Sequence, residues 1–189
     1  MSSRPEPAVL ELVASGELDR DLVALLWLLA ERGVPLVVAS LDAAAAERFR
    51  TVLGGAVRAA QPALDAIAGG VVMADSLEDV LRLAGGPATG QLVDEARDLG
   101  VVVVHDGRRV RSAHYIRQIE RDAAGHLQRR PPALLAAWNA DLDVIDHFHW
   151  SITDELATRS GMTRDDFERE LARRIEQLGG DVVGSWPWH

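Results

Sequence analysis

The 189-residue sequence contains neither cysteine nor lysine. The absence of cysteine excludes disulfide bonds, thiolate zinc sites and cysteine nucleophiles, and it agrees with a cytoplasmic location. All 20 basic residues are arginine. The chain therefore has no Schiff-base lysine, no lysine general base and no lysine to contact the β- and γ-phosphates of a nucleotide.

Long apolar runs are also missing. The longest, residues 22–30, is far shorter than the roughly 20 residues that a membrane-spanning helix needs. The N-terminal segment MSSRPEP is polar and lacks the apolar core of a signal peptide. We therefore expect a soluble, cytoplasmic protein without a membrane span.

Positive charge is scarce overall, since the net charge is -9. This balance disfavours broad binding to nucleic acids, because their phosphate backbones are held mainly by lysine and arginine. The arginines are nevertheless unevenly spread, and seven of them lie between Arg108 and Arg130. A local basic patch is therefore expected on an acidic protein.

The spacing of apolar residues predicts short helices that alternate with buried strands, followed by hairpins. Helices are predicted at residues 8–16, 19–32, 40–53, 61–68, 76–83, 92–99 and 153–178. Strands are predicted at residues 34–39, 70–73, 101–104, 110–119, 134–138 and 144–148. The pattern is that of an α/β fold with an antiparallel β-hairpin extension and a C-terminal helix.

Local signals fix several boundaries of these elements. Asp19 and Thr163 are predicted helix N-caps, and Glu78 is placed for a capping-box contact at the helix that follows Asp75 and Ser76. We assign residues 1–130 to an α/β domain and residues 131–189 to a hairpin and helical extension that packs on it. The two parts are expected to form a single globular unit.

Three segments resemble the ATPases of type II and type IV secretion, which belong to the P-loop NTPase superfamily. They are ELVASGELDRDLVALLWLLAERGVPLVVAS (residues 11–40), VVMADSLEDVL (71–81) and GVVVVHDGRRVRSAHYIRQIERD (100–122). In that family, such segments lead into the phosphate-binding loop, form the histidine-box strand and helix, and close the nucleotide-binding domain. The resemblance implies a truncated RecA-like sheet.

The residues that carry the family's chemistry are missing. A phosphate-binding loop needs G-x-x-x-x-G-K-[ST], but residues 40–52 contain neither glycine nor lysine. Asp42 stands at the start of the following helix, where it would cap the helix and repel phosphate. The family's catalytic acid aligns with Ala56 and its histidine with Met73. We therefore expect no cofactor, no nucleotide and no ATP hydrolysis.

A divalent metal is an alternative ligand. Asp143, His147 and His149 would share one face of a strand, while Asp146 would point the other way. Histidine and carboxylate side chains are common ligands of zinc and related metals, although another ligand would have to come from elsewhere, such as His114 or His126. The competing interpretation is an edge strand with polar side chains on its solvent face.

The arginine-rich segment has three open interpretations. It is a solvated face paired with local acids, a protein interface that uses the planar guanidinium groups, or a site for nucleic acid or nucleotide. Arg109, Arg111 and Tyr115 would share one face of the strand, with His114 on the other. The candidate interface residues are Arg109, Arg111, Tyr115, Arg117, Arg121, Arg129 and Arg130.

Other catalytic patterns are absent from the sequence. There is no G-x-S-x-G nucleophile motif and no G-x-G-x-x-G dinucleotide fingerprint. Two hypotheses follow. The first is a non-catalytic interaction or regulatory protein with a protein partner or self-association. The second is a protein that binds a small ligand or divalent metal through Asp143, His147 and His149.

Overall fold

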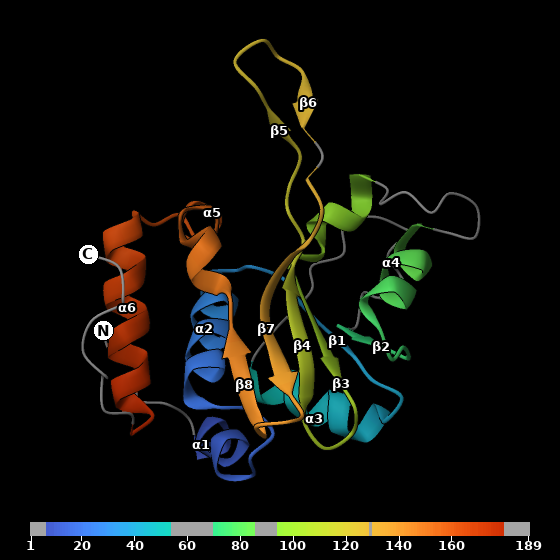
Figure 1. Cartoon of the computed structure of the whole chain (residues 1–189), viewed down its shortest axis with the longest axis vertical. Helices are drawn as coiled ribbons and strands as arrows, with labels where there is room; N and C mark the ends of the chain where they lie inside the picture. Colours follow the sequence, from blue (N-terminus) through green and yellow to red (C-terminus); the bar gives the residue numbers. More distant parts are fainter. Residues whose placement is uncertain (1–6, 54–69, 86–93, 129, 180–189) are drawn as a thin grey trace.

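The computed structural model describes residues 7–53, 70–85, 94–128 and 130–179. In this part of the chain, helices lie on both faces of a six-stranded mixed sheet, and a two-stranded hairpin projects away from it (Figure 1). The strands are β1 (Leu36–Ala39), β2 (Val71–Val72), β3 (Val101–His105), β4 (Val110–Tyr115), β5 (Glu120–Arg121), β6 (Leu127–Gln128), β7 (Ala133–Asn139) and β8 (Val144–His147). The helices are α1 (Pro7–Ala14), α2 (Arg20–Glu31), α3 (Ala43–Leu53), α4 (Leu77–Gly85), α5 (Thr153–Arg159) and α6 (Arg164–Gln177), with 3₁₀ helices η2 (Asp94–Leu99) and η3 (His149–Ile152). The prediction of an α/β fold is confirmed.

Strands β2, β1 and β3 are parallel neighbours, in that order. All four residues of β1 and all five of β3 are buried, as expected for parallel strands that are covered on both faces. Helix α3, which follows β1 in the sequence, shares a core with α2, whereas α4, which follows β2, packs against the opposite face. The two helices therefore cover different faces of the parallel half.

The other half of the sheet is antiparallel and runs β3-β4-β7-β8. A predicted turn joins β3 to β4: the Asp106 N–H donates to the Arg109 carbonyl at 3.1 Å, and Gly107 adopts a φ of 93°. The predicted C-terminal hairpin forms as β7 and β8. Because β7 pairs directly with β4, residues on both sides of position 130 build the same sheet.

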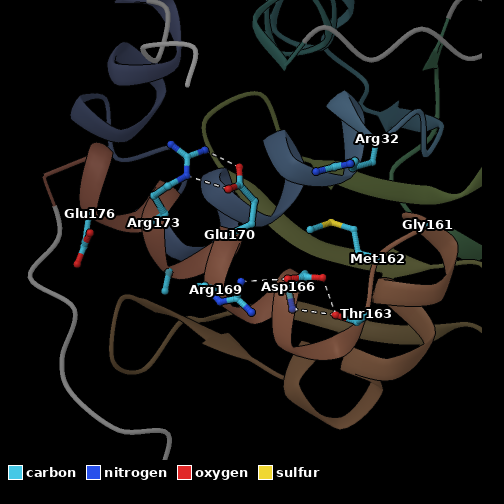
Figure 2. A pocket seen from close by; sticks show the side chains of 10 residues that line it. Arg32, Gly161, Met162, Thr163, Asp166, Arg169, Glu170, Arg173 and Glu176 are labelled. Atoms are coloured by element: carbon cyan, nitrogen blue, oxygen red, sulfur yellow. Dashed lines mark hydrogen bonds and ion pairs between the residues drawn. The ribbon is translucent and has the colours of Figure 1, made fainter. Parts of the chain in front are cut away.

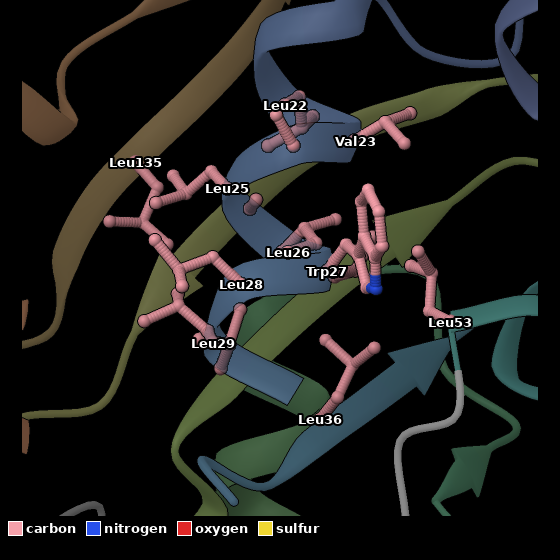
Figure 3. Packing of buried hydrophobic residues seen from close by; sticks show 14 of the residues in the cluster. Leu22, Val23, Leu25, Leu26, Trp27, Leu28, Leu29, Leu36, Leu53 and Leu135 are labelled. Atoms are coloured by element: carbon pink, nitrogen blue, oxygen red, sulfur yellow. The ribbon is translucent and has the colours of Figure 1, made fainter. Parts of the chain in front are cut away.

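Helix α2 forms the centre of the larger core, and its residues 22–29 are all buried. Figure 3 shows these side chains packed with Leu36 of β1, Leu53 of α3 and Leu135 of β7. As predicted, Asp19 is the N-cap, and its carboxylate accepts a hydrogen bond from the Leu22 N–H at 2.9 Å. A helix that is apolar all round belongs in the interior, and α2 accordingly connects the sheet with the other helices on this face.

Helix α4 packs against the other face of the parallel strands. Ser76 caps its N-terminus: the hydroxyl accepts from the Asp79 N–H at 3.2 Å and donates to the Asp79 carboxylate at 2.7 Å. The prediction that Glu78 makes the capping-box contact is wrong. That contact is made three residues after the cap, and Asp79 holds this position. Glu78 instead pairs with Arg82 at 2.9 Å.

Two other elements differ from the prediction in extent or type. The strand expected over residues 110–119 ends at Tyr115. The Ile116 N–H still donates to the Gly100 carbonyl at 2.7 Å in the register of the β3–β4 ladder, but β3 itself begins at Val101 and the chain then leads into β5. We term β5, β6 and their turn (residues 120–128) the arm. The helix expected over residues 92–99 is the 3₁₀ helix η2. The helix expected over residues 61–68 lies outside the described residues.

Helix α6 packs against α2 on the face of the larger core. As predicted, Thr163 is its N-cap. Phe167 and Leu171 are buried in the core, and the Arg174 guanidinium lies 4.3 Å from the centroid of the Trp27 ring. None of the helices in the described part of the chain is long and apolar enough to cross a bilayer.

Candidate functional site

The carboxyl ends of parallel strands are where open α/β sheets bind their ligands. Here β1 ends at Ala39, and Ser40 Oγ accepts a hydrogen bond from the Asp42 N–H at 3.0 Å. The Asp42 carboxylate in turn accepts from the Ala45 N–H at 3.0 Å. The prediction that Asp42 caps this helix is confirmed. One backbone N–H group in the first turn of α3, that of Ala45, therefore already donates to a side chain of the protein itself.

The turn between β3 and β4 closes over the same place. A Cβ added to Gly107 would lie 3.4 Å from the Asp42 Cβ, so the turn and the start of α3 are in close contact. Leu41 and Met73, which follow β1 and β2, are 64% and 56% exposed. A phosphate-binding loop would offer backbone N–H groups and a lysine here. This edge of the sheet offers a carboxylate and two apolar side chains.

The positive charges of the candidate arginine surface are compensated by neighbouring carboxylate and carbonyl oxygen atoms. The contacts are Arg109 with Asp143, Arg111 with Asp106 (3.7 Å), Arg117 with Glu155 (2.8 Å), Arg121 with the Gly125 carbonyl (3.0 Å), and Arg130 with Glu120 and with Glu155 (3.1 Å). Tyr115 is 4% exposed and packs in the core, so it is not part of an exposed face. Arg129 lies outside the described residues. This is the arrangement expected of a solvated face paired with local acids.

Arg109 and Arg111 do share one face of the sheet, as predicted. Their guanidinium carbons lie 4.5 Å and 4.9 Å from the centroid of the Trp138 ring on β7. His114 lies on the opposite face, also as predicted, where its Nε2 is 2.9 Å from Ser112 Oγ. Trp138 therefore forms an aromatic platform under two guanidinium groups, which are attracted to the face of the ring.

The candidate metal ligands do not converge. Asp143 precedes β8 with a φ of 54° and pairs with Arg109. The expectation that His149 shares a strand face with His147 is wrong, because β8 ends at His147 and His149 belongs to η3. The two imidazole rings meet edge-on with their centroids 5.6 Å apart. Across the residues that the structure describes, no group of three or more histidine, aspartate or glutamate side chains is arranged to hold a metal ion.

His147 instead connects β8 with the start of α2, since its Nε2 lies 2.6 Å from Asp19 Oδ2. Burial lowers the pKa of His147, but the hydrogen bond to Asp19 and the charges of Asp19, Asp21 and Asp146 together more than offset this effect, and the net shift is upward. His149 is 4% exposed. Burial, followed by the charge of His147, lowers the pKa of His149 to about 4. The two adjacent rings therefore favour opposite protonation states.

A second histidine–carboxylate pair lies at the end of β3 and is not singled out by the sequence. His105 is 1% exposed, and its Nε2 lies 3.3 Å from Glu17 Oε2. The Gly107 N–H donates to Nδ1 of the same ring at 3.0 Å, so the neutral ring carries its proton on Nε2 and donates to Glu17. Arg48 also donates to this carboxylate, at 2.5 Å.

Both carboxylates come from one short loop between α1 and α2, and each faces one of the two histidines. A cavity of about 290 Å³ adjoins this loop. Its lining combines Gly16, Glu17, Leu18 and Asp19 of the loop with Arg109, Val110, Trp138, Asp143, Val144 and Ile145 from β4, β7, β8 and their turns. The cavity therefore brings carboxylates, one guanidinium and the Trp138 platform together beside β8.

A wider hollow of about 730 Å³ lies beside α6, between this helix and the end of α2 (Figure 2). Its charged groups are compensated along α6, where Arg169 pairs with Asp166 at 3.0 Å and Arg173 with Glu170 at 2.5 Å. The Thr163 hydroxyl is engaged with Asp166 as the helix cap. These four charged side chains of α6 therefore neutralise one another in two pairs.

Comparison with protein-family models finds no family that matches the chain, and comparison with curated proteins finds no match. The likeness to the secretion ATPases thus rests on the three sequence segments quoted above.

Proposed function

We propose that this protein is a non-catalytic interaction or regulatory protein whose scaffold is a truncated, RecA-like relative of the secretion ATPases. The non-catalytic part is supported at the end of β1, where Asp42 caps α3 and lies against the turn at Gly107. A phosphate placed there would face this carboxylate, and the chain has no lysine to neutralise it. We infer that the protein neither binds nor hydrolyses ATP.

The observation that carries the interaction function is a concentration of exposed apolar side chains around β8. Of the nine large hydrophobic residues that are exposed in the described part of the chain, four lie within residues 142–150. They are Leu142 (68%), Val144 (47%), Phe148 (37%) and Trp150 (49%). Contiguous exposed apolar patches mark protein-interaction sites, and these four residues lie within nine positions of the chain. We term these side chains and the backbone of β8 the β8 edge.

The absence of nucleotide binding is tested by thermal unfolding with Mg-ATP, with Mg-ADP and without nucleotide. A ligand that binds the native state stabilises it by RT ln(1 + [L]/Kd), so millimolar nucleotide bound with micromolar affinity raises the unfolding midpoint by several degrees. We expect the three midpoints to coincide. A clear rise would overturn this part of the proposal and leave only the loss of hydrolysis.

The interaction function is tested by quantitative affinity capture from the cells that encode the protein. We compare the wild type with Val144→Arg in the β8 edge and with Leu83→Arg, a matched control at an exposed leucine of α4. We expect a protein that the wild type and the control retain and that Val144→Arg loses. Identical captures for all three, together with a monomer in sedimentation, would refute an interaction through this edge.

A metal-binding or small-ligand function has less support from the geometry. Of its three candidate residues, Asp143 is paired with Arg109 and His147 with Asp19, and His149 faces His147 from η3. Elemental analysis of the purified protein tests the metal form directly. A divalent metal found in a stoichiometric amount would favour the metal-binding function over the interaction function proposed here.

A further inference from the structure

Among the described residues, no strand neighbours the outer backbone edge of β8, which is the last strand of the sheet. On the inner side, the Phe148 N–H donates to the Leu135 carbonyl at 2.8 Å. Residues of an antiparallel pair alternate in the edge toward which they bond, so Ile145 and His147 direct their N–H and C=O groups outward. Within the described residues, the Trp150 indole N–H reaches the His147 carbonyl at 3.1 Å, and no strand pairs with the remaining groups.

The surroundings of this edge are acidic. Asp141, Asp143 and Asp146 follow one another around the start of β8, and Asp19 and Asp21 lie at the start of α2 beside His147. Desolvation raises the pKa of Asp21, and the charge of Asp19 raises it further although His147 and Arg20 oppose the shift. Asp143 is paired with Arg109 and Asp19 with His147. The excess negative charge therefore comes from Asp21, Asp141 and Asp146, and a basic partner fits it better than an acidic one.

The cavity beside the loop between α1 and α2 lies on one face of this edge. Ile145 contributes to its lining and packs against the larger core. A residue that pairs directly opposite Ile145 on an added strand would place its side chain on the same face of the sheet. At about 290 Å³, the cavity is at the small end of ligand pockets, roughly 300–1,000 Å³, a size suited to one long side chain.

The lining of the cavity suits a guanidinium or ammonium group. Asp19 and Asp143 supply carboxylates, and Trp138 supplies the aromatic ring. The same ring already holds the Arg109 guanidinium at 4.5 Å, with Asp143 accepting from Arg109. The chemistry that a basic side chain needs, a carboxylate beside an aromatic face, is thus already present in the wall of the cavity.

We propose that the β8 edge binds an extended, basic segment of a partner protein by strand addition, with an arginine or lysine of that segment entering the cavity lined by Asp19, Trp138 and Asp143. Main-chain hydrogen bonds supply affinity in this recognition mode, and alternate side chains supply specificity. The proposal rests on the interaction function above and names the chemistry of its partner.

The test uses the full chain and three synthetic peptides in fluorescence anisotropy. The first alternates arginine with valine or threonine. The second replaces the arginines with glutamate, and the third keeps the arginines but carries N-methyl groups on the amides of one edge, which blocks strand pairing without changing the charge. We expect the first peptide to bind and the other two to bind at least about tenfold more weakly.

Two charge-matched variants test the cavity. Asp143→Asn removes a carboxylate from its wall, whereas Asp75→Asn removes one after β2, at the opposite edge of the sheet. We expect the first variant to weaken binding of the arginine peptide about two- to fivefold, the range of one exposed ion pair, and the control to leave it unchanged. The difference should shrink at high salt because exposed charges are screened.

Each of the following results would overturn the inference or a part of it. Equal binding of the methylated peptide would exclude strand addition, and equal binding by the two variants would exclude the cavity. A concentration-dependent dimer that Val144→Arg dissolves would show that a second copy takes the edge. If none of the peptides binds while the captured partner is still lost in Val144→Arg, the partner chemistry is wrong and the interaction function stands. If no peptide binds and the wild type and Val144→Arg also capture the same proteins, both the partner chemistry and the interaction function are wrong.

Discussion

Two histidines at the end of β8 illustrate how single residues couple this structure to pH. His147 lies 2.6 Å from Asp19. Burial lowers the pKa of His147, but the hydrogen bond to Asp19 and the charges of the neighbouring aspartates together raise it. His149, one residue beyond Phe148, is more deeply buried and faces the His147 ring, and its pKa falls to about 4. The first histidine thus stabilises the fold as a cation and the second as a neutral ring.

We predict that His149 makes the free energy of unfolding fall as the pH drops from about 6.5 to about 4. In this window the unfolded chain takes up a proton at a histidine of ordinary pKa 6.5, whereas the folded protein does not. The full shift corresponds to roughly 3 kcal/mol. The contribution of His147 has the opposite sign and is lost only above pH 6.5, as the pH rises through its raised pKa.

Urea unfolding at several pH values measures this effect. In His149→Gln the ring no longer titrates, so stability should depend less steeply on pH between 6.5 and 4 than in the wild type. His126→Gln is the matched control, since that ring is 80% exposed on the arm. If His149→Gln kept the slope of the wild type, burial of His149 would not be coupled to protonation.

Residue-scale predictions from the sequence succeed where the partner is close in the chain. Asp19, Asp42 and Thr163 are recognisable as helix caps because each bonds to an N–H three residues later. The histidine–carboxylate pairs are not recognisable in this way. His105 and its partner Glu17 are 88 residues apart, and His147 and Asp19 are 128 residues apart. No local pattern specifies such a contact, because the packing of β3, β4 and β8 against one loop creates it.

At the scale of elements, the entry into β3 depends on a close approach of two backbone segments. Gly100 has a φ of 69°, and a Cβ added there would lie 2.5 Å from the Pro35 carbonyl oxygen. That carbonyl accepts the hydrogen bond of the Val101 N–H at 2.9 Å. The segment before β1 is therefore held against the segment before β3, which aligns the two parallel strands.

We predict that Gly100→Ala destabilises the protein by more than about 3 kcal/mol, since the clash is with backbone and has no flexible side chain to yield. Gly125→Ala on the arm is the matched control. It has a similar φ of 84° with nothing within 4 Å of an added Cβ, so it should cost only the left-handed strain of about 1–2 kcal/mol. Urea midpoints compare the two, and equal losses would mean that the contact with Pro35 relaxes freely.

Apart from the 3₁₀ helix η2, the types of the described elements follow from the sequence, whereas their ends depend on tertiary contacts. The apolar runs of residues 34–39 and 70–73 predict buried strands, and β1 and β2 form there as parallel neighbours. The run of residues 101–104 predicts the first strand of a hairpin, and β3 pairs with β4 in this way while also pairing in parallel with β1. The periodicity does not locate the end of β4, because that end depends on where the partner strand β3 begins, at Val101. Similarly, β8 is one residue shorter than predicted, and the chain then turns into η3. Because β8 ends at His147, His149 does not lie on the same strand face, and the predicted metal-binding face does not form.

At the scale of the whole molecule, the larger core joins both ends of the chain. Its buried side chains come from α1, α2 and α3, from strands β1, β3, β4 and β7, and from α5 and α6. Leu135, Leu156 and Phe167, which follow position 130, are all fully buried. An antiparallel extension was expected beyond that position, but β7 is an interior strand between β4 and β8, so the two halves of the chain share one hydrophobic interior.

We predict that a fragment of residues 1–130 does not fold alone. It would leave one edge of β4 unpaired and expose the surface of α2 that packs against α6, β7 and their neighbours. The free energy of apolar burial that the fragment loses is large compared with the roughly 5–15 kcal/mol by which folded domains are more stable than unfolded ones. The full chain should instead unfold in one transition, with coincident curves from circular dichroism and tryptophan fluorescence.

The fragment 1–179 is the control because it keeps every described helix and strand. Cooperative unfolding of the fragment 1–130 would show that the chain contains two independent units, and the β8 edge would then belong to an appendage instead of the main sheet.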